Sequence, residues 1–205
     1  MRKLNIFILL IILAILPSFG AVPNSSLSSY LKGCKLMVEA LSSHNKEKLQ
    51  LAIECFDEAN ATALDISSIN FEGGETKPEY LFTADFADEI LLNDFSLAKL
   101  DPEALLRHDI SDSELVLYHL YLGPGESATL FIDGADNMTV SVTSGGIADA
   151  TLSISDETNN FKESINTTSE NENSAISWDM QTPATMATTV KNISDTGATF
   201  VVIFN

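Results

Sequence analysis

The alternation of hydrophobic and polar residues changes its period once along this chain, near residue 113. Before that point, apolar residues recur every three to four positions, the spacing of one face of an α-helix. After it, apolar and polar residues alternate over short runs, with turn residues every eight to twelve positions, as is typical of β-strands. The pattern predicts an α+β fold: an N-terminal helical hairpin with short helices, then an antiparallel, jelly-roll-like β-sandwich.

Residues 25–60 carry two apolar stripes at helical spacing, which predict two antiparallel helices. The segment from Ser42 to Asn45 breaks the pattern between them, and Asn45 is a suitable N-cap for the second helix. The stripe residues are Leu27, Tyr30, Leu31, Cys34, Met37, Val38 and Leu41 in the first helix, and Leu49, Ala52, Ile53, Phe56 and Ala59 in the second.

For residues 61–112 we expect short helices and loops that pack on the hairpin. Phe86 and Ile90 suggest a short helix after Asp85, and the sequence Asp101-Pro102-Glu103 combines an N-cap, a proline at the first helical position and an acid in the first turn. We therefore divide the chain into a signal peptide (1–20), a helical segment (21–112) and a β-sandwich domain (113–205).

Seven or eight short strands are expected in the β-sandwich domain. They lie at 115–122, around 130–132, 138–142, 152–154, around 161–165, 176–180, 186–190 and 198–204. Side chains on alternate positions of a strand face opposite sides. We expect the residues on one face of each strand to form the core, including Val140, Val142, Trp178, Phe200 and Val202.

The first twenty residues have the order of a secretory signal peptide. Arg2 and Lys3 precede eleven uninterrupted apolar residues, Pro17 ends that run, and small residues stand at Ser18 and Gly20. The run is too short to span a bilayer of roughly 30 Å. We therefore expect cleavage near Gly20/Ala21 and a secreted or periplasmic mature chain without membrane insertion.

A likeness to a known type of module follows from the strand pattern. The succession of Leu122 to Glu126, Ala128 to Asp133, Met138 to Val142, Val190 to Asn192 and Thr199 to Phe204 resembles the bacterial pre-peptidase C-terminal type of β-sandwich. The resemblance covers residues 115–205. It implies a non-catalytic module of the kind appended to secreted hydrolases, and it transfers no site residue.

The chain is strongly acidic, with 29 Asp and Glu against 11 Lys and Arg and a formal net charge of −18. From residue 113 onward the only basic residues are Lys162 and Lys191. Such a surface repels phosphate backbones and anionic lipid, so it argues against nucleic-acid and peripheral membrane binding. It is compatible with cations and basic partners, and it also keeps an exported protein in solution.

Cys34 and Cys55 are the two cysteines, and each lies on or beside the apolar stripe of one predicted helix. In an oxidising compartment an isolated pair is commonly a disulfide. We therefore expect a Cys34–Cys55 bond, closing a loop of about twenty residues and worth roughly 3 kcal/mol. Two small buried thiols are the alternative. A metal site is disfavoured because no His is near.

Candidate chemistry is sparse. His44 lies in the hairpin turn, His108 near the end of a short helix and His119 within a strand. The segment from Gly125 to Thr129 is the nearest approach to a nucleophile elbow, but it lacks the second glycine and lies between strands. A Ser-His-Asp triad is recognised by the geometry of its side chains and not by their positions in the sequence. The sequence alone therefore assigns no catalytic residue.

One turn offers a candidate ion site. Asp133, Asp136 and Asn137 place three oxygen-bearing side chains close together in the sequence. Calcium takes six to eight oxygen ligands, and the segment lacks EF-hand spacing. A solvated hairpin turn built on Asp-Gly is the simpler interpretation, and calcium is the one cofactor that the sequence suggests.

These observations favour an exported, non-enzymatic binding protein of the bacterial envelope or exterior, whose β-sandwich contacts a protein or glycan partner. Two alternatives stay open. One is a small secreted hydrolase that uses carboxylates or a cryptic triad, and the other is a calcium-stabilised adhesive or carbohydrate-binding module.

Overall fold

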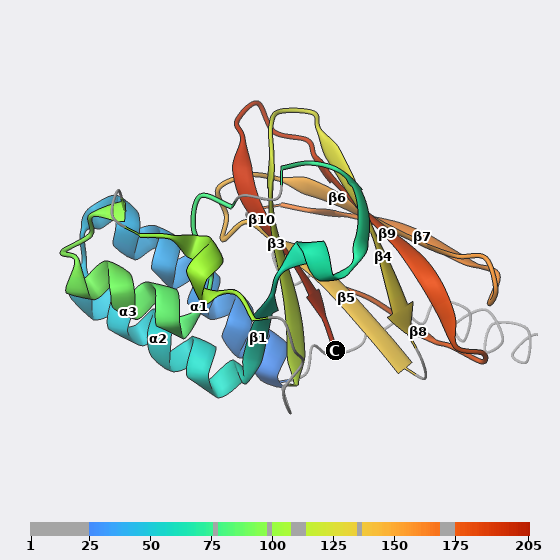
Figure 1. Cartoon of the computed structure of the whole chain (residues 1–205), viewed down its shortest axis with the longest axis horizontal. Helices are drawn as coiled ribbons and strands as arrows, with labels where there is room; N and C mark the ends of the chain where they lie inside the picture. Colours follow the sequence, from blue (N-terminus) through green and yellow to red (C-terminus); the bar gives the residue numbers. More distant parts are fainter. Residues whose placement is uncertain (1–24, 76–77, 98–99, 108–113, 135–136, 169–174) are drawn as a thin grey trace, which may run out of the picture.

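The computed structural model describes residues 25–75, 78–97, 100–107, 114–134, 137–168 and 175–205. Figure 1 shows the helices gathered on one side and the strands on the other. One hydrophobic cluster joins the helices to one sheet, and a second cluster lies between the two sheets. The described chain therefore has three layers: helices, a helix-facing sheet and an outer sheet.

The helical hairpin is confirmed. Helix α1 (Ser25–Ser43) and helix α2 (Lys46–Ala59) lie against each other, and the Asn45 side chain caps α2 by accepting a hydrogen bond from the Lys48 N–H. Helix α3 (Ala84–Leu92) begins after the Thr83 cap. There are also two 3₁₀ turns: η4 (Pro102–Leu105) contacts α3, and η2 (Ile66–Ser68) contacts β2 and β3. Asp101 caps η4 as the sequence predicts.

Within the described residues, the two sheets have five strands each. The helix-facing sheet has the order β1-β3-β10-β5-β8, and the outer sheet has the order β2-β4-β9-β6-β7. All neighbours are antiparallel except β1 and β3, which are parallel. The strands are β1 (Ala61–Leu64), β2 (Asn70–Gly73), β3 (Leu115–Leu122), β4 (Ser127–Gly134), β5 (Asn137–Thr143), β6 (Ala150–Asp156), β7 (Phe161–Thr167), β8 (Ala175–Asp179), β9 (Ala184–Asn192) and β10 (Ala198–Phe204).

The helix-facing sheet is buried on both faces along β3 and β10, because helices cover one side and the outer sheet covers the other. Leu115 and Leu117 of β3 belong to the cluster with the helices, whereas Tyr118 and Leu120 belong to the cluster between the sheets. Strand β10 is buried at every position. The predicted core is confirmed, since Val140, Val142, Trp178, Phe200 and Val202 are all buried between the sheets.

Strands β1 and β2 lie in the segment for which the sequence predicts only short helices and loops. Each is four residues long, too short for alternation to be recognised, and each is held by a partner strand more than 50 residues away in the chain. Both sheets therefore extend across the predicted boundary at residue 113.

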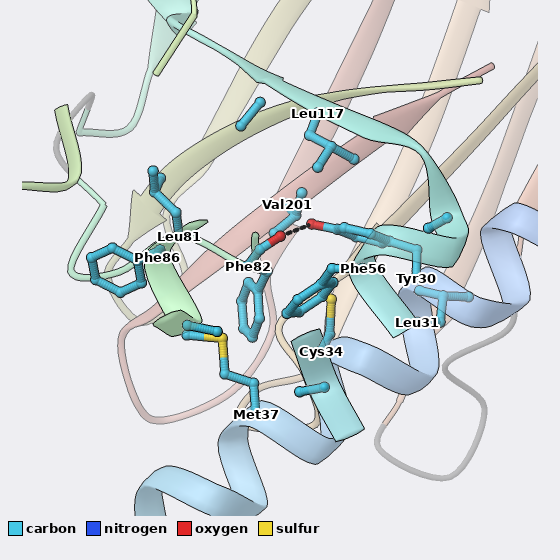
Figure 2. Close-up of a cluster of buried hydrophobic side chains, with 14 of the residues drawn as sticks. Tyr30, Leu31, Cys34, Met37, Phe56, Leu81, Phe82, Phe86, Leu117 and Val201 are labelled. Carbon is cyan, nitrogen blue, oxygen red and sulfur yellow. Dashed lines mark hydrogen bonds between the residues drawn. The ribbon is translucent and has the colours of Figure 1, made fainter. Parts of the chain in front are cut away.

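The predicted Cys34–Cys55 disulfide is wrong, because both residues are buried thiols that form no disulfide in the structure. The reason is the rotation of α1. Gly33 faces Cys55, so that a methyl group added at Gly33 would lie 3.2 Å from the Cys55 Cβ. Cys34 belongs instead to the cluster between α1 and the helix-facing sheet, close to Tyr30 and Phe56 (Figure 2).

Residues 1–24 lie outside the described residues, so the signal peptide and its cleavage near Ala21 stay predictions. Among the described helices, none combines the length and the hydropathy needed to cross a membrane.

Candidate functional site

A cavity of about 670 Å³ opens at one end of the sandwich. It lies where η2 meets the ends of β3, β4 and β10, and both apolar and polar side chains line it. The lining residues are Ser67, Ser68, Ile69, Asn70, Glu114, Val116, Tyr118, Phe131, Ile132, Asp133, Met138, Thr185, Phe204 and Asn205. We call this space the end cavity.

Aromatic and aliphatic groups line the interior of the end cavity. The rings of Tyr118 and Phe204 meet edge to face, with centroids 5.9 Å apart. Val116, Ile132 and Met138 are only half-buried, although each packs against the core between the sheets. The cavity therefore keeps some apolar surface in contact with water.

Burial raises the pKa of Tyr118, and a side-chain hydrogen bond with Ser68 opposes this shift. The phenol therefore stays neutral at physiological pH and can donate a hydrogen bond. Ser68 belongs to η2, which the Asp65 side chain caps through the Ser67 N–H at 2.8 Å.

Two carboxylates belong to the rim of the end cavity. Glu114 precedes β3 and accepts a hydrogen bond from the hydroxyl of Ser26, near the start of α1. Asp133 is close to the end of β4 and accepts a hydrogen bond from Thr185 of β9 at 2.5 Å. Each carboxylate is thus positioned by a hydroxyl from another element.

The candidate calcium turn is only partly visible. Asp133 and Asn137 are exposed, and Asp136 lies outside the described residues. Within the described ranges, no group of three or more His, Cys, Asp or Glu side chains is placed to hold a metal ion.

The described histidines do not come together in one site. His44 contacts Phe95 in the helical layer, with ring centroids 5.3 Å apart, and His108 lies outside the described residues. His119 is 2% exposed, and its Nε2 atom accepts a hydrogen bond from the Phe82 N–H at 3.0 Å. Burial lowers the pKa of His119 to about 3, so the ring is neutral at physiological pH.

Trp178 is a core residue, as predicted. Its indole stacks on the ring of Phe161, with centroids 5.0 Å apart and planes 6° from parallel. The indole face is therefore covered and is not a platform for a sugar ring.

A smaller cavity, of about 200 Å³, lies where the end of α2 approaches the start of α3 and β1. Its lining is mainly polar and includes Asp57, Asn60, Asp85 and Arg107. Tyr30 and Phe82 also line it, and the Tyr30 hydroxyl donates a hydrogen bond to the Phe82 carbonyl at 2.9 Å (Figure 2).

The sequence analysis missed the end cavity, because Tyr118 and Phe204 occupy positions that a strand pattern assigns to the core. One signal could have indicated it. Leu130, Phe131 and Ile132 are three consecutive apolar residues in β4 and break the alternation there. Phe131 and Ile132 are both half-buried and both line the cavity.

No family model matches the chain, and no curated protein matches it. Among solved structures, an oxalate oxidase is similar at 17% identity and a TM-score of 0.31, over 44% of this chain and 41% of that chain. The Yersinia pseudotuberculosis-derived mitogen is similar at 12% identity and a TM-score of 0.36, over 45% of this chain and 85% of that chain. A designed double-stranded β-helix is similar at 12% identity and a TM-score of 0.29, over 43% of this chain and 97% of that chain. Likenesses this remote transfer no ligand, activity or partner to this chain, and the resemblance to pre-peptidase C-terminal modules stays a prediction.

Proposed function

We propose that this chain is an exported, non-enzymatic binding protein, and that its end cavity receives an apolar group of the ligand. The observation that carries the proposal is the cavity itself. Its volume of about 670 Å³ lies within the roughly 300–1,000 Å³ of small-molecule sites, and its lining combines apolar and aromatic side chains with polar groups that can orient a ligand.

Burial of the half-buried apolar residues by a ligand would stabilise the complex. Val116, Ile132 and Met138 each keep some surface in water at the cavity. Covering such surface stabilises a complex by about 25 cal/mol per Å². The hydroxyl of Tyr118 and the carboxylates of Glu114 and Asp133 would then orient the ligand at the rim.

The other hypotheses have less support. The Nε2 of His119 is occupied by the Phe82 N–H, which leaves this histidine poorly suited to act as a general base in a hydrolase. The buried indole of Trp178 gives a glycan no stacking surface. A calcium-stabilised module would need further oxygen ligands beside Asp133.

Calorimetric titration with 2-naphthalenemethanol, a neutral aromatic alcohol, tests the proposal. We expect one saturable site with a Kd below about 1 mM, which is a modest affinity for a ligand of this size. Met138→Trp, which fills the cavity, should weaken binding tenfold or more. Ile193→Trp places the same ring at an exposed position and should leave binding unchanged.

Thermal melting of both variants checks that each is folded. Absence of saturable binding to the wild type, or equal binding by a folded Met138→Trp variant, would contradict the proposal.

A further inference from the structure

We infer that the end cavity selects ligands that carry a cationic group beside the apolar one, such as an aromatic or alkyl amine. This inference rests on the proposed function, because it concerns the chemistry of the ligand in the same cavity. It follows from the charges at the rim and from the aromatic groups that line the same cavity.

The charge at the rim has one sign. Glu114 and Asp133 line the cavity, and none of the described lining residues is basic. An ionised carboxylate only accepts hydrogen bonds, with two oxygens available. Among the described residues, Ser26 donates to Glu114 and Thr185 donates to Asp133, and each carboxylate can still accept another donor. An ammonium group supplies such donors together with the complementary charge.

The aromatic residues favour the same ligand. Tyr118 and Phe204 line the cavity with rings 5.9 Å apart in an edge-to-face arrangement. A cation within about 6 Å of an aromatic face is attracted by the ring quadrupole, with Tyr and Phe both effective. An anionic ligand would gain nothing from these rings and would be repelled by both carboxylates.

Three probes that share one naphthalene ring separate charge from shape. They are 2-naphthylmethylamine, which is cationic, 2-naphthalenemethanol, which is neutral, and 2-naphthoate, which is anionic. We expect the amine to bind about tenfold more tightly than the alcohol at low salt, and the naphthoate to bind most weakly. The preference for the amine should shrink as salt is raised, because the rim carboxylates are near the surface and are screened.

The double variant Glu114→Gln/Asp133→Asn tests whether the rim causes the preference. Each amide keeps an oxygen that can accept the bond from Ser26 or Thr185. We expect the affinity for the amine to fall about tenfold and the affinity for the alcohol to stay within twofold. The matched control is Glu54→Gln/Asp88→Asn, which removes two exposed charges from the helical layer and should leave the ratio of the two affinities within twofold.

The outcomes are distinguishable from failure of the proposed function. If the alcohol does not bind the wild type, the cavity is not an apolar ligand site and the proposed function fails. If the alcohol binds and the amine binds equally well, the ligand site stands and the cationic preference is overturned. An equal loss of amine affinity in the control variant would also overturn it, because the preference would then come from the overall charge of −18.

Discussion

His119 and Phe82 connect the helical layer to the middle of the helix-facing sheet. The His119 Nε2 accepts the Phe82 N–H at 3.0 Å, and the two rings lie 21° from parallel. A neutral imidazole that accepts at Nε2 carries its proton on Nδ1. This Nδ1 is buried and has no hydrogen-bond partner among the described residues.

The histidine should make folding sensitive to acid. Burial lowers the pKa of His119 to about 3, below the value of about 6.5 expected in the unfolded chain. The unfolded state therefore binds the proton first, and stability is present above pH 6.5 and is lost as the pH falls towards 3. Lowering the pH from 7 to 4 should therefore reduce the free energy of unfolding by about 3 kcal/mol through His119.

Urea denaturation of the wild type and of His119→Gln at several pH values measures this cost. The variant removes the titrating group, so its stability should fall less between pH 7 and pH 4. Parallel pH profiles for the two proteins would contradict the buried, neutral state of His119.

Trp178 should contribute strongly to stability through its burial and its stacking on Phe161. The indole is 8% exposed, and its Nε1 has no hydrogen-bond partner among the described residues. Trp178→Ala should therefore cost about 3 to 5 kcal/mol, whereas Trp178→Phe keeps a stacking ring and should cost less than about 1.5 kcal/mol. Chemical denaturation distinguishes these values, and an unchanged stability for Trp178→Ala would refute the core assignment.

Cys34 and Cys55 should both titrate as thiols. We expect two thiols per chain in denaturant without a reductant, and slow reaction in the native protein, because both side chains are buried. A thiol reagent with an optical readout gives the count. Added reductant should leave the melting temperature unchanged, and a count of zero would restore the disulfide.

Asn192 should be far more sensitive to substitution than other asparagines of the sandwich. Its side chain donates to the carbonyls of Leu122 and Thr196 and accepts the Ser194 N–H, and it is fully buried. Asn192→Ala leaves these groups unpaired and should cost at least about 2 kcal/mol. Asn166→Ala, at an exposed position, is the control and should cost less than about 1 kcal/mol. Similar losses in both variants would argue against this role.

The sequence predicts the elements that are determined by their own residues, and it misses those that depend on residues far away in the chain. Strand β6 was predictable because its apolar residues alternate with polar ones and its burial alternates in the same way. Strand β5 was predictable from the same alternation in its sequence, although its last four residues are all buried. Strands β1 and β2 were not, because their pairing with β3 and β4 is a property of the whole fold. The disulfide was mispredicted because a helical stripe is wide, and the position of Cys34 on the stripe does not say that Gly33 is the residue that faces Cys55.

The site was less predictable than the fold. Asp133 could be singled out from the sequence, but as a calcium ligand rather than as a rim carboxylate. Tyr118 and Phe204 lie on predicted strands, and both are buried. That they also line a cavity depends on where η2 meets the ends of β3, β4 and β10, and no local pattern encodes this arrangement.

Methyl NMR of the protein titrated with 2-naphthalenemethanol tests the central claim, that the end cavity binds an apolar group, most directly. We expect the largest chemical-shift changes at Ile69, Val116 and Ile132, which line the cavity, and little change at Ile154 or Val190, which lie in the same core away from it. Changes concentrated at Leu105 and Leu117, beside the smaller cavity, or no saturable changes at all, would contradict the account.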